Sequence, residues 1–306
     1  MNWQMGKVVA ALCVAWCGVA QAAPLVLADP YVKAGVSDLY GTLGSNGSTS
    51  PGILFDPTGT STYGVNDFLT PGSEFEGFYL TADGANWGSN NSGTLDNINS
   101  PFTLTALSPT QVRADSTTAD GVLSIRHQYT LGRVGTRSEI TIQTTLTNRS
   151  GTAVTNLKAL RTLDPDPDVN TYGDYDTVNT LPSATRACAE GASTGQTICL
   201  TTASASYSPR AGIGPDAPWP TSPDAFLAGL NAGNGDNTIG LAFNIGTLAP
   251  GASVVLNYSY ILSETLDGAG GGAVAKPVPG LAPWGLAMLA GGLAFVGSRR
   301  KKARQA

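Results

Sequence analysis

Acidic and amide side chains in the stretch DPDPDVNTYGDYD, residues 164–176, have the types and spacing of an oxygen-rich cation site. A residue that precedes proline is held in extended backbone, so the repeated Asp-Pro dipeptides place carboxylates at alternate positions, within roughly 7 Å of one another. Such carboxylates repel unless a cation or an arginine compensates them, and Ca²⁺ takes roughly six to eight oxygen ligands. The segment predicts a possible Ca²⁺ site, the one cofactor that the sequence suggests, with these ligands: Asp164, Asp166, Asp168, Asn170 and Asp174, and Asp176 close by.

The same segment has a second interpretation, a solvated acidic loop. It does not match an EF-hand loop, because Val169 stands where the turn glycine belongs and Tyr175 where the bidentate glutamate belongs. Arg161 and Arg186 flank the segment and are able to neutralise the aspartates without a cation. The sequence leaves both interpretations open.

Two tryptophans stand in polar, glycine- or proline-rich surroundings. Trp87 lies in DGANWGSNNSG and Trp219 in DAPWPTSPD, and both segments are expected to be loops. An exposed indole stacks on a sugar ring while neighbouring Asn and Asp side chains bind its hydroxyls, so both residues are candidate ligand-binding groups. The alternative is that each indole closes one end of a hydrophobic core.

Residues that indicate an enzyme are few. The segment GASTG, residues 191–195, fits G-x-S-x-G but is not expected at the strand-to-helix turn that exposes such a serine. His127 is the one histidine, which excludes a histidine-based metal cluster, and its place in a strand pattern predicts a hydrogen-bonded, half-buried side chain. We therefore expect no catalytic residues and no enzyme, although the 22 acidic residues leave a glycosidase pair of carboxylates open.

Two cysteines remain once the N-terminal segment is set aside. Cys188 and Cys199 enclose the loop CAEGASTGQTIC between two stretches that are able to form a strand pair. In an oxidising compartment we expect them to form a disulfide that stabilises the protein by about 3 kcal/mol. The alternative is a pair of buried free thiols.

Alternating strand patterns dominate the interior of the chain. In residues 122–131, Leu, Ile, His and Tyr alternate with polar side chains, and residues 139–148 repeat the pattern after a glycine-containing connection. Residues 237–246 and 254–262 flank the turn TLAPGAS and predict a second hairpin. Amphipathic helices are missing from the pattern, so we expect an all-β, antiparallel β-sandwich of one large domain or two subdomains over residues 23–266.

The two ends of the chain read as targeting segments. Residues 1–22 contain a lysine, an apolar stretch and the A-x-A motif AQA, which predicts a helical signal peptide. Residues 267–277 form a Gly/Pro linker, and residues 281–297 are uncharged and are followed by RRKK. We expect this hydrophobic helix to hold the exported body at the membrane, with its basic end in the cytoplasm.

The C-terminal segment, residues 278–306, resembles a known sorting signal. Its order of a short proline motif, a hydrophobic stretch and an arginine-rich end is similar to PEP-CTERM signals, and VPGLAPWG is similar to the IPTL-CTERM variant at Val278, Pro279, Leu281, Trp284 and Gly285. Gly280, Ala282 and Pro283 depart from that variant. The resemblance implies recognition by an exosortase-type transpeptidase and delivery to the cell surface or matrix. The body resembles bacterial exported β-sandwich modules in its TNRSG and LAPG turns, a similarity that concerns fold alone.

The charge distribution supports export. Six of the 17 basic residues lie in the two terminal segments and all 22 acidic residues lie between them, so the interior carries a net charge of about −11. This excludes a nucleic-acid partner. We expect an exported structural or binding protein whose partners are signal peptidase, an exosortase-type enzyme, and a polysaccharide or matrix. The alternatives are a secreted carbohydrate-binding or carbohydrate-active β-sandwich protein and a permanent single-pass membrane protein.

Overall fold

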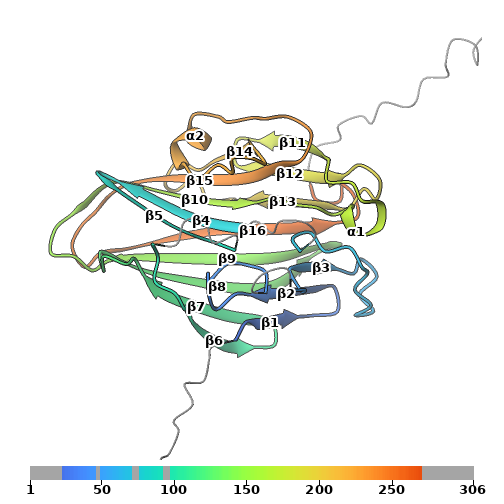
Figure 1. Ribbon diagram of the computed structural model, residues 1–306, viewed down its shortest axis with the longest axis horizontal. Coiled ribbons are helices and arrows are strands. Elements are labelled where there is room, and N and C mark those ends of the chain that lie inside the picture. Colours follow the sequence, from blue (N-terminus) through green and yellow to red (C-terminus); the bar gives the residue numbers. More distant parts are fainter. Residues whose placement is uncertain (1–22, 46–48, 71–75, 92–96, 271–306) are drawn as a thin grey trace, which may run out of the picture.

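The computed structural model describes residues 23–45, 49–70, 76–91 and 97–270. Over these residues the chain is an antiparallel β-sandwich, which confirms the predicted fold class (Figure 1). Two large sheets face each other, and the side chains between them form one hydrophobic core.

The larger sheet has eight strands. In spatial order they are β11 (Thr177–Ser183), β12 (Arg186–Gly191), β13 (Thr197–Thr201), β16 (Ser253–Ser263), β9 (Arg137–Asn148), β8 (Leu123–Val134), β7 (Gln111–Thr117) and β6 (Thr103–Ser108).

The second large sheet has five strands, in the order β14 (Arg210–Pro215), β15 (Asn237–Leu248), β10 (Val154–Leu163), β4 (Glu76–Ala82) and β5 (Ala85–Asn90). A small sheet of β1 (Leu25–Ala28), β2 (Val32–Val36) and β3 (Ile53–Phe55) adds its apolar side chains to the same core. The described helices are short: α1 (Val169–Tyr172) and α2 (Pro223–Leu227).

The predicted hairpin of residues 122–131 and 139–148 is confirmed as β8 and β9. Leu131 pairs with Ile140, and the alternate side chains that the pattern assigned to one face are buried along both strands. Gly135 supplies a positive φ of 63° in the connecting turn. The alternation of apolar and polar side chains thus predicts the buried face of both strands correctly.

The predicted second hairpin is wrong. The turn exists, with Gly251 at a φ of 71°, but the flanking strands do not pair with each other. β15 pairs with β10 and β14 in one sheet, whereas β16 pairs with β9 and β13 in the other. The connection therefore crosses between the layers. The alternation of a strand reports which face is buried but does not report its partner.

Helix α2 covers the outer face of the five-stranded sheet. Its Phe226 is fully buried against Tyr79, Leu160 and Ala242. The ring lies over Gly240 of β15, where an added Cβ would be 2.3 Å from the Cε1 atom of Phe226. Glycine is required here because helix and sheet approach so closely. This contact buries β15 on both faces.

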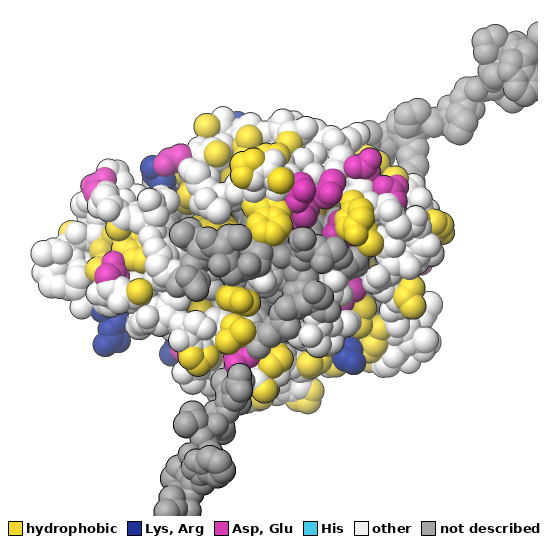
Figure 2. Space-filling model, viewed as in Figure 1, with side chains coloured by type: hydrophobic (Ala, Val, Ile, Leu, Met, Phe, Trp, Pro, Cys, Tyr) yellow, Lys and Arg dark blue, Asp and Glu magenta, His cyan; other side chains and the backbone are white. Residues whose placement is uncertain are grey.

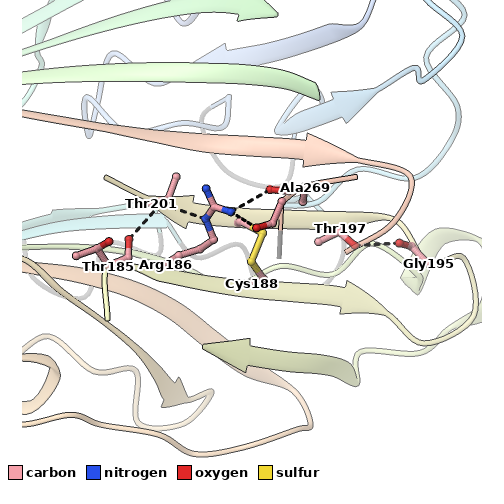
Figure 3. Close-up of a disulfide and its surroundings, with 9 residues drawn as sticks. Thr185, Arg186, Cys188, Gly195, Thr197, Thr201 and Ala269 are labelled. Carbon is pink, nitrogen blue, oxygen red and sulfur yellow. Dashed lines mark hydrogen bonds between the residues drawn. A yellow bond between two sulfur atoms is a disulfide. The ribbon is translucent and has the colours of Figure 1, made fainter. Parts of the chain in front are cut away.

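Cys188 and Cys199 form the predicted disulfide. They are directly opposed register partners on β12 and β13, with the two Cα atoms 4.0 Å apart. Leu266 and Ala269, from the segment after β16, pack against the sulfurs, and Arg186 donates to the carbonyl oxygen of Ala269 (Figure 3). The disulfide and Arg186 therefore hold the end of the described body against the larger sheet.

Residues 1–22 and 271–306, which contain both predicted hydrophobic helices, lie outside the described residues. The start of the predicted linker, residues 267–270, is described, and its Ala269 is buried beside the disulfide. Within the described part of the chain, no helix has the length and apolar character needed to cross a membrane.

Candidate functional site

An acidic pocket opens at one end of the five-stranded sheet, where strands β10 and β14 end and β15 begins. Its volume is about 400 Å³, and it is lined by Asp164, Asp166, Tyr175, Asp216, Ala217, Trp219 and Asp236. On the face shown in Figure 2, acidic side chains gather between hydrophobic ones. The pocket thus combines carboxylates with two aromatic walls.

The strand topology explains why three aspartates meet there. Asp164 follows the end of β10, Asp216 follows the end of β14, and Asp236 precedes β15, which lies between those strands. Both neighbours run antiparallel to β15, so their last residues lie beside its first. One carboxylate oxygen from each of the three lies within 4.8 Å of the other two.

Burial and mutual repulsion dominate the electrostatics of the pocket. Asp164 is 5% exposed and Asp166 is 4% exposed. Burial, followed by the carboxylates of Asp236 and Asp216, raises the pKa of Asp164 to about 8. Burial and the neighbouring Asp164 raise the pKa of Asp166 to about 9, and burial with Asp216 also raises the pKa of Asp236.

The pocket carboxylates have no basic partner among the described residues. No lysine or arginine lines the pocket. Arg161 binds Glu76 instead, and Arg186 binds Thr201 and the backbone of Ala269. The interpretation of the segment as an acidic loop neutralised by these two arginines therefore does not fit the described residues.

The five predicted ligands do not form one group. Asp164 and Asp166 lie in the pocket, but the chain leaves extended conformation at α1, which separates them from the rest. Asp168 accepts hydrogen bonds from the backbone N–H groups of Ser193 and Thr194, at 2.7 and 3.2 Å. It thereby anchors the loop after β12, which contains the GASTG segment.

The two other predicted ligands point elsewhere. The amide of Asn170 donates to the carbonyl oxygen of Val65 at 2.7 Å. Asp174 accepts from the backbone N–H of Asp176 at 3.0 Å. The pocket gains Asp216 and Asp236 in their place. In the sequence each of these borders a strand, but only the strand order places them beside Asp164.

Trp219 lies in the pocket, as a half-buried side chain. Its Nε1 donates to the Oδ1 atom of Asp216 at 2.8 Å, and its ring packs against the cluster around Phe226. Helix α2 and Asp216 therefore fix the orientation of the indole. Tyr175, which the sequence did not single out as a binding residue, is 42% exposed and also lines the pocket.

The expectation that Trp87 lies in a loop is wrong. It belongs to β5 and is 4% exposed, and its Nε1 donates to the Oδ2 atom of Asp120 at 2.9 Å. Its ring is part of the main core, which is the alternative that the sequence left open.

His127 is buried and hydrogen-bonded. It is 1% exposed, and its Nδ1 lies 2.8 Å from the Oγ1 atom of Thr144. Its ring meets the ring of Phe78 edge-on, with centroids 4.7 Å apart. Burial, followed by the charge of Arg161, lowers the pKa of His127 well below its usual value. The residue belongs to the core rather than to the pocket.

Comparison with known proteins gives similarity in structure alone. No family model and no curated protein matches the sequence. A bacterial glucoamylase solved in complex with acarbose aligns with 81% of this chain at a TM-score of 0.52 and 10% identity, and the chain spans 34% of the glucoamylase. This similarity shows the fold.

Two smaller proteins align along nearly their whole length. A galactose mutarotase-like protein from Lactobacillus casei has a TM-score of 0.44 and 11% identity, over 78% of this chain and 100% of its own. A galactose mutarotase related enzyme from Lactobacillus acidophilus has a TM-score of 0.38 and 10% identity, over 79% and 98%.

The similarity to the glucoamylase corrects the expectation that the chain is not an enzyme, because the same fold occurs in an enzyme. That expectation depended on the lack of a recognisable nucleophile and base in the sequence. The sandwich is shared with part of a glucoamylase, so the fold is not confined to structural modules. Carboxylates such as those of the pocket are also the groups that carry acid–base chemistry on sugars.

Proposed function

We propose that this chain is an exported carbohydrate-active protein and that its acidic pocket binds the sugar. The observation that carries the proposal is the placement of Trp219 and Tyr175 beside the carboxylates of Asp164, Asp216 and Asp236 in one pocket. Flat aromatic rings contact the apolar faces of a sugar, while carboxylates accept hydrogen bonds from its hydroxyls. The pocket offers both kinds of contact.

The order of the indole supports this use of the pocket. Trp219 is fixed by its hydrogen bond to Asp216 and by the packing of α2, so little side-chain entropy is lost when a ligand stacks on it. Tyr175 is exposed and is available to a second sugar unit or to the other side of the ring. The glucoamylase that shares the fold is a protein solved with acarbose, and this is consistent with a carbohydrate ligand.

Export is the second part of the proposal. The N-terminal signal pattern, the net negative interior and the IPTL-CTERM-like segment at residues 278–285 all favour delivery outside the cytoplasm. The Cys188–Cys199 disulfide is also typical of an oxidising compartment. We propose that signal peptidase and an exosortase-type enzyme process the ends and that the body reaches the cell surface or matrix.

The test is a glycan array combined with an assay for sugars released from the bound glycans. We expect Trp219→Ala and Tyr175→Ala each to weaken binding by about 5- to 150-fold, the loss that corresponds to the roughly 1–3 kcal/mol contributed by an aromatic ring stacked on a planar ligand such as a nucleobase. Tyr172→Ala is the matched control, because Tyr172 is 58% exposed and lies outside the pocket lining. Equal binding by the wild type and both pocket variants would contradict the proposal.

A further inference from the structure

We propose that the acidic pocket binds one Ca²⁺ ion through the carboxylates of Asp164, Asp216 and Asp236, with Asp166 lining the pocket beside them. This inference goes beyond the proposed sugar binding and does not depend on it. It also differs from the site that the sequence predicted, because two of the ligands come from distant strands.

The spacing of the carboxylates fits Ca²⁺. Two oxygens that bind the same Ca²⁺ at about 2.4 Å are at most about 4.8 Å apart. One oxygen each from Asp164, Asp216 and Asp236 meets this limit. Mg²⁺ requires nearly octahedral geometry and usually keeps several bound waters, so a site built from three protein carboxylates suits Ca²⁺ better. The ligand atoms are all oxygens, which favours Ca²⁺ over zinc or copper.

Unsatisfied oxygens give an independent indication of a ligand. The Oδ1 atoms of Asp164 and Asp166 are buried, and neither has a hydrogen-bond partner among the described residues. Both side chains are more than nine-tenths buried, and both line the pocket. A buried carboxylate oxygen without a partner is costly, and a bound cation removes that cost.

The position of the ligands supports a preformed site. Asp164, Asp216 and Asp236 directly border three hydrogen-bonded strands, so the sheet fixes their backbones. Asp166 is also held, because its backbone N–H donates to the carbonyl oxygen of Phe68 at 2.9 Å. No arginine or lysine lines the pocket, so no basic side chain in the lining competes with a cation.

The experiment is calorimetric titration of the full chelator-treated protein with CaCl₂, and separately with MgCl₂. We expect one Ca²⁺ per chain, weaker Mg²⁺ binding, and a melting temperature that rises with the logarithm of the Ca²⁺ concentration. A wild type that gives no binding heat and no rise in melting temperature would overturn the proposal.

Two variants and one control test the assignment of ligands. Asp236→Asn and Asp216→Asn each remove a charged ligand and are expected to weaken Ca²⁺ binding by at least about tenfold. Asp224→Asn is the control, because Asp224 is an exposed residue of α2 that pairs with Lys158 and lies outside the pocket. Melting in EDTA reports whether each variant folds. Folded variants that keep wild-type affinity would overturn the assignment, whereas Ca²⁺ binding without glycan binding would contradict the proposed function alone.

Discussion

The guanidinium of Arg161 binds the carboxylate of Glu76 in the centre of the sandwich rather than the aspartates that follow it in the chain. Its Nε and Nη2 atoms meet the two carboxylate oxygens, the latter at 2.6 Å, and both side chains are fully buried. Tyr260, from the opposite sheet, donates to the same carboxylate at 2.8 Å. Burial disfavours the charge of Arg161, but the nearby Glu76 raises the pKa of Arg161 well above its usual range. The pair lies within the five-stranded sheet, and the hydrogen bond from Tyr260 joins it to the larger sheet. Because Arg161 is engaged here, the pocket has no basic partner from this residue.

Glu76→Gln is therefore expected to destabilise the fold by about 3–5 kcal/mol, because it leaves a buried guanidinium without its counter-charge. Urea unfolding gives the free energy of unfolding. Asp115→Asn is the control, since Asp115 forms partly exposed surface pairs with Arg113 and Arg126, and surface pairs contribute about 1 kcal/mol or less each. Equal losses in both variants would mean that the buried pair is not a main determinant of stability.

His127 gives a pH-dependent contribution to stability. Its pKa is lowered in the fold, so below about pH 6.5 the unfolded chain takes up a proton that the folded chain does not, and stability falls as the pH falls. Arg161 is the charged group that lowers this pKa, after burial. The slope attributable to His127 is at most about 1.4 kcal/mol per pH unit.

Urea unfolding of the wild type and of His127→Gln at pH 7.5, 6 and 5 isolates this contribution. The difference between the two proteins should shrink as the pH falls, because the wild type alone loses the histidine contribution, while the pocket aspartates titrate in both. A difference that stays constant over this range would show that His127 takes up a proton in the fold as readily as in the unfolded chain.

The sequence was sufficient for elements whose burial follows from local alternation. The buried face of β8 and β9, the cross-strand disulfide and the turn at Gly251 were all predictable, because each depends on residues close together in the chain. The partner of β15 was not. Its burial on both faces depends on Phe226, which comes from a helix too short to leave a periodic pattern.

The pocket was predictable in part, for the same reason. Asp164 and Asp166 stood out because only Pro165 separates them in the sequence, whereas Asp216 and Asp236 join them only through the order β14-β15-β10. Asp168 was assigned to the cation although it closes a loop, since hydrogen bonds to Ser193 and Thr194 leave no mark in the sequence. Each of the aspartates that were missed borders a strand, and that is the sequence feature that could have drawn attention to them.

Removal of the disulfide is expected to lower stability by about 3 kcal/mol, through the lost restraint on the unfolded chain. Urea unfolding of the oxidised wild type and of Cys188→Ser/Cys199→Ser measures this loss. The melting temperature of the double variant should equal that of the wild type in dithiothreitol. Hydrogen exchange should also rise in residues 264–270, because Leu266 and Ala269 pack against the sulfurs. Unchanged exchange there would show that the disulfide does not hold the segment after β16 in place.

Gly240→Ala tests the link between helix α2 and the pocket. The added methyl would lie 2.3 Å from the ring of Phe226, so α2 must move, at a cost of about 1–3 kcal/mol. Since Trp219 packs against the same cluster, glycan binding should weaken as well. Gly132→Ala is the control, because no atom lies within 4 Å of the added methyl there, and its stability and binding should match the wild type. If a destabilised Gly240→Ala variant bound glycan as the wild type does, the position of α2 would not determine glycan binding.

The fate of the C-terminal segment decides between a sorted surface protein and a permanent membrane protein. Residues 281–297 are uncharged and end at RRKK, so during export they are expected to stop in the membrane with the basic end in the cytoplasm. A transpeptidase that recognises residues 278–285 would then release the body from this anchor. We therefore expect intact-mass measurement of the protein from its native host to show a chain without residues 286–306. A host without such an enzyme should retain them, as should a Pro279→Ala variant in the native host, whereas Pro277→Ala, outside the motif, should be processed normally. A native protein that still carries the RRKK end would identify the segment as a lasting anchor and would contradict sorting.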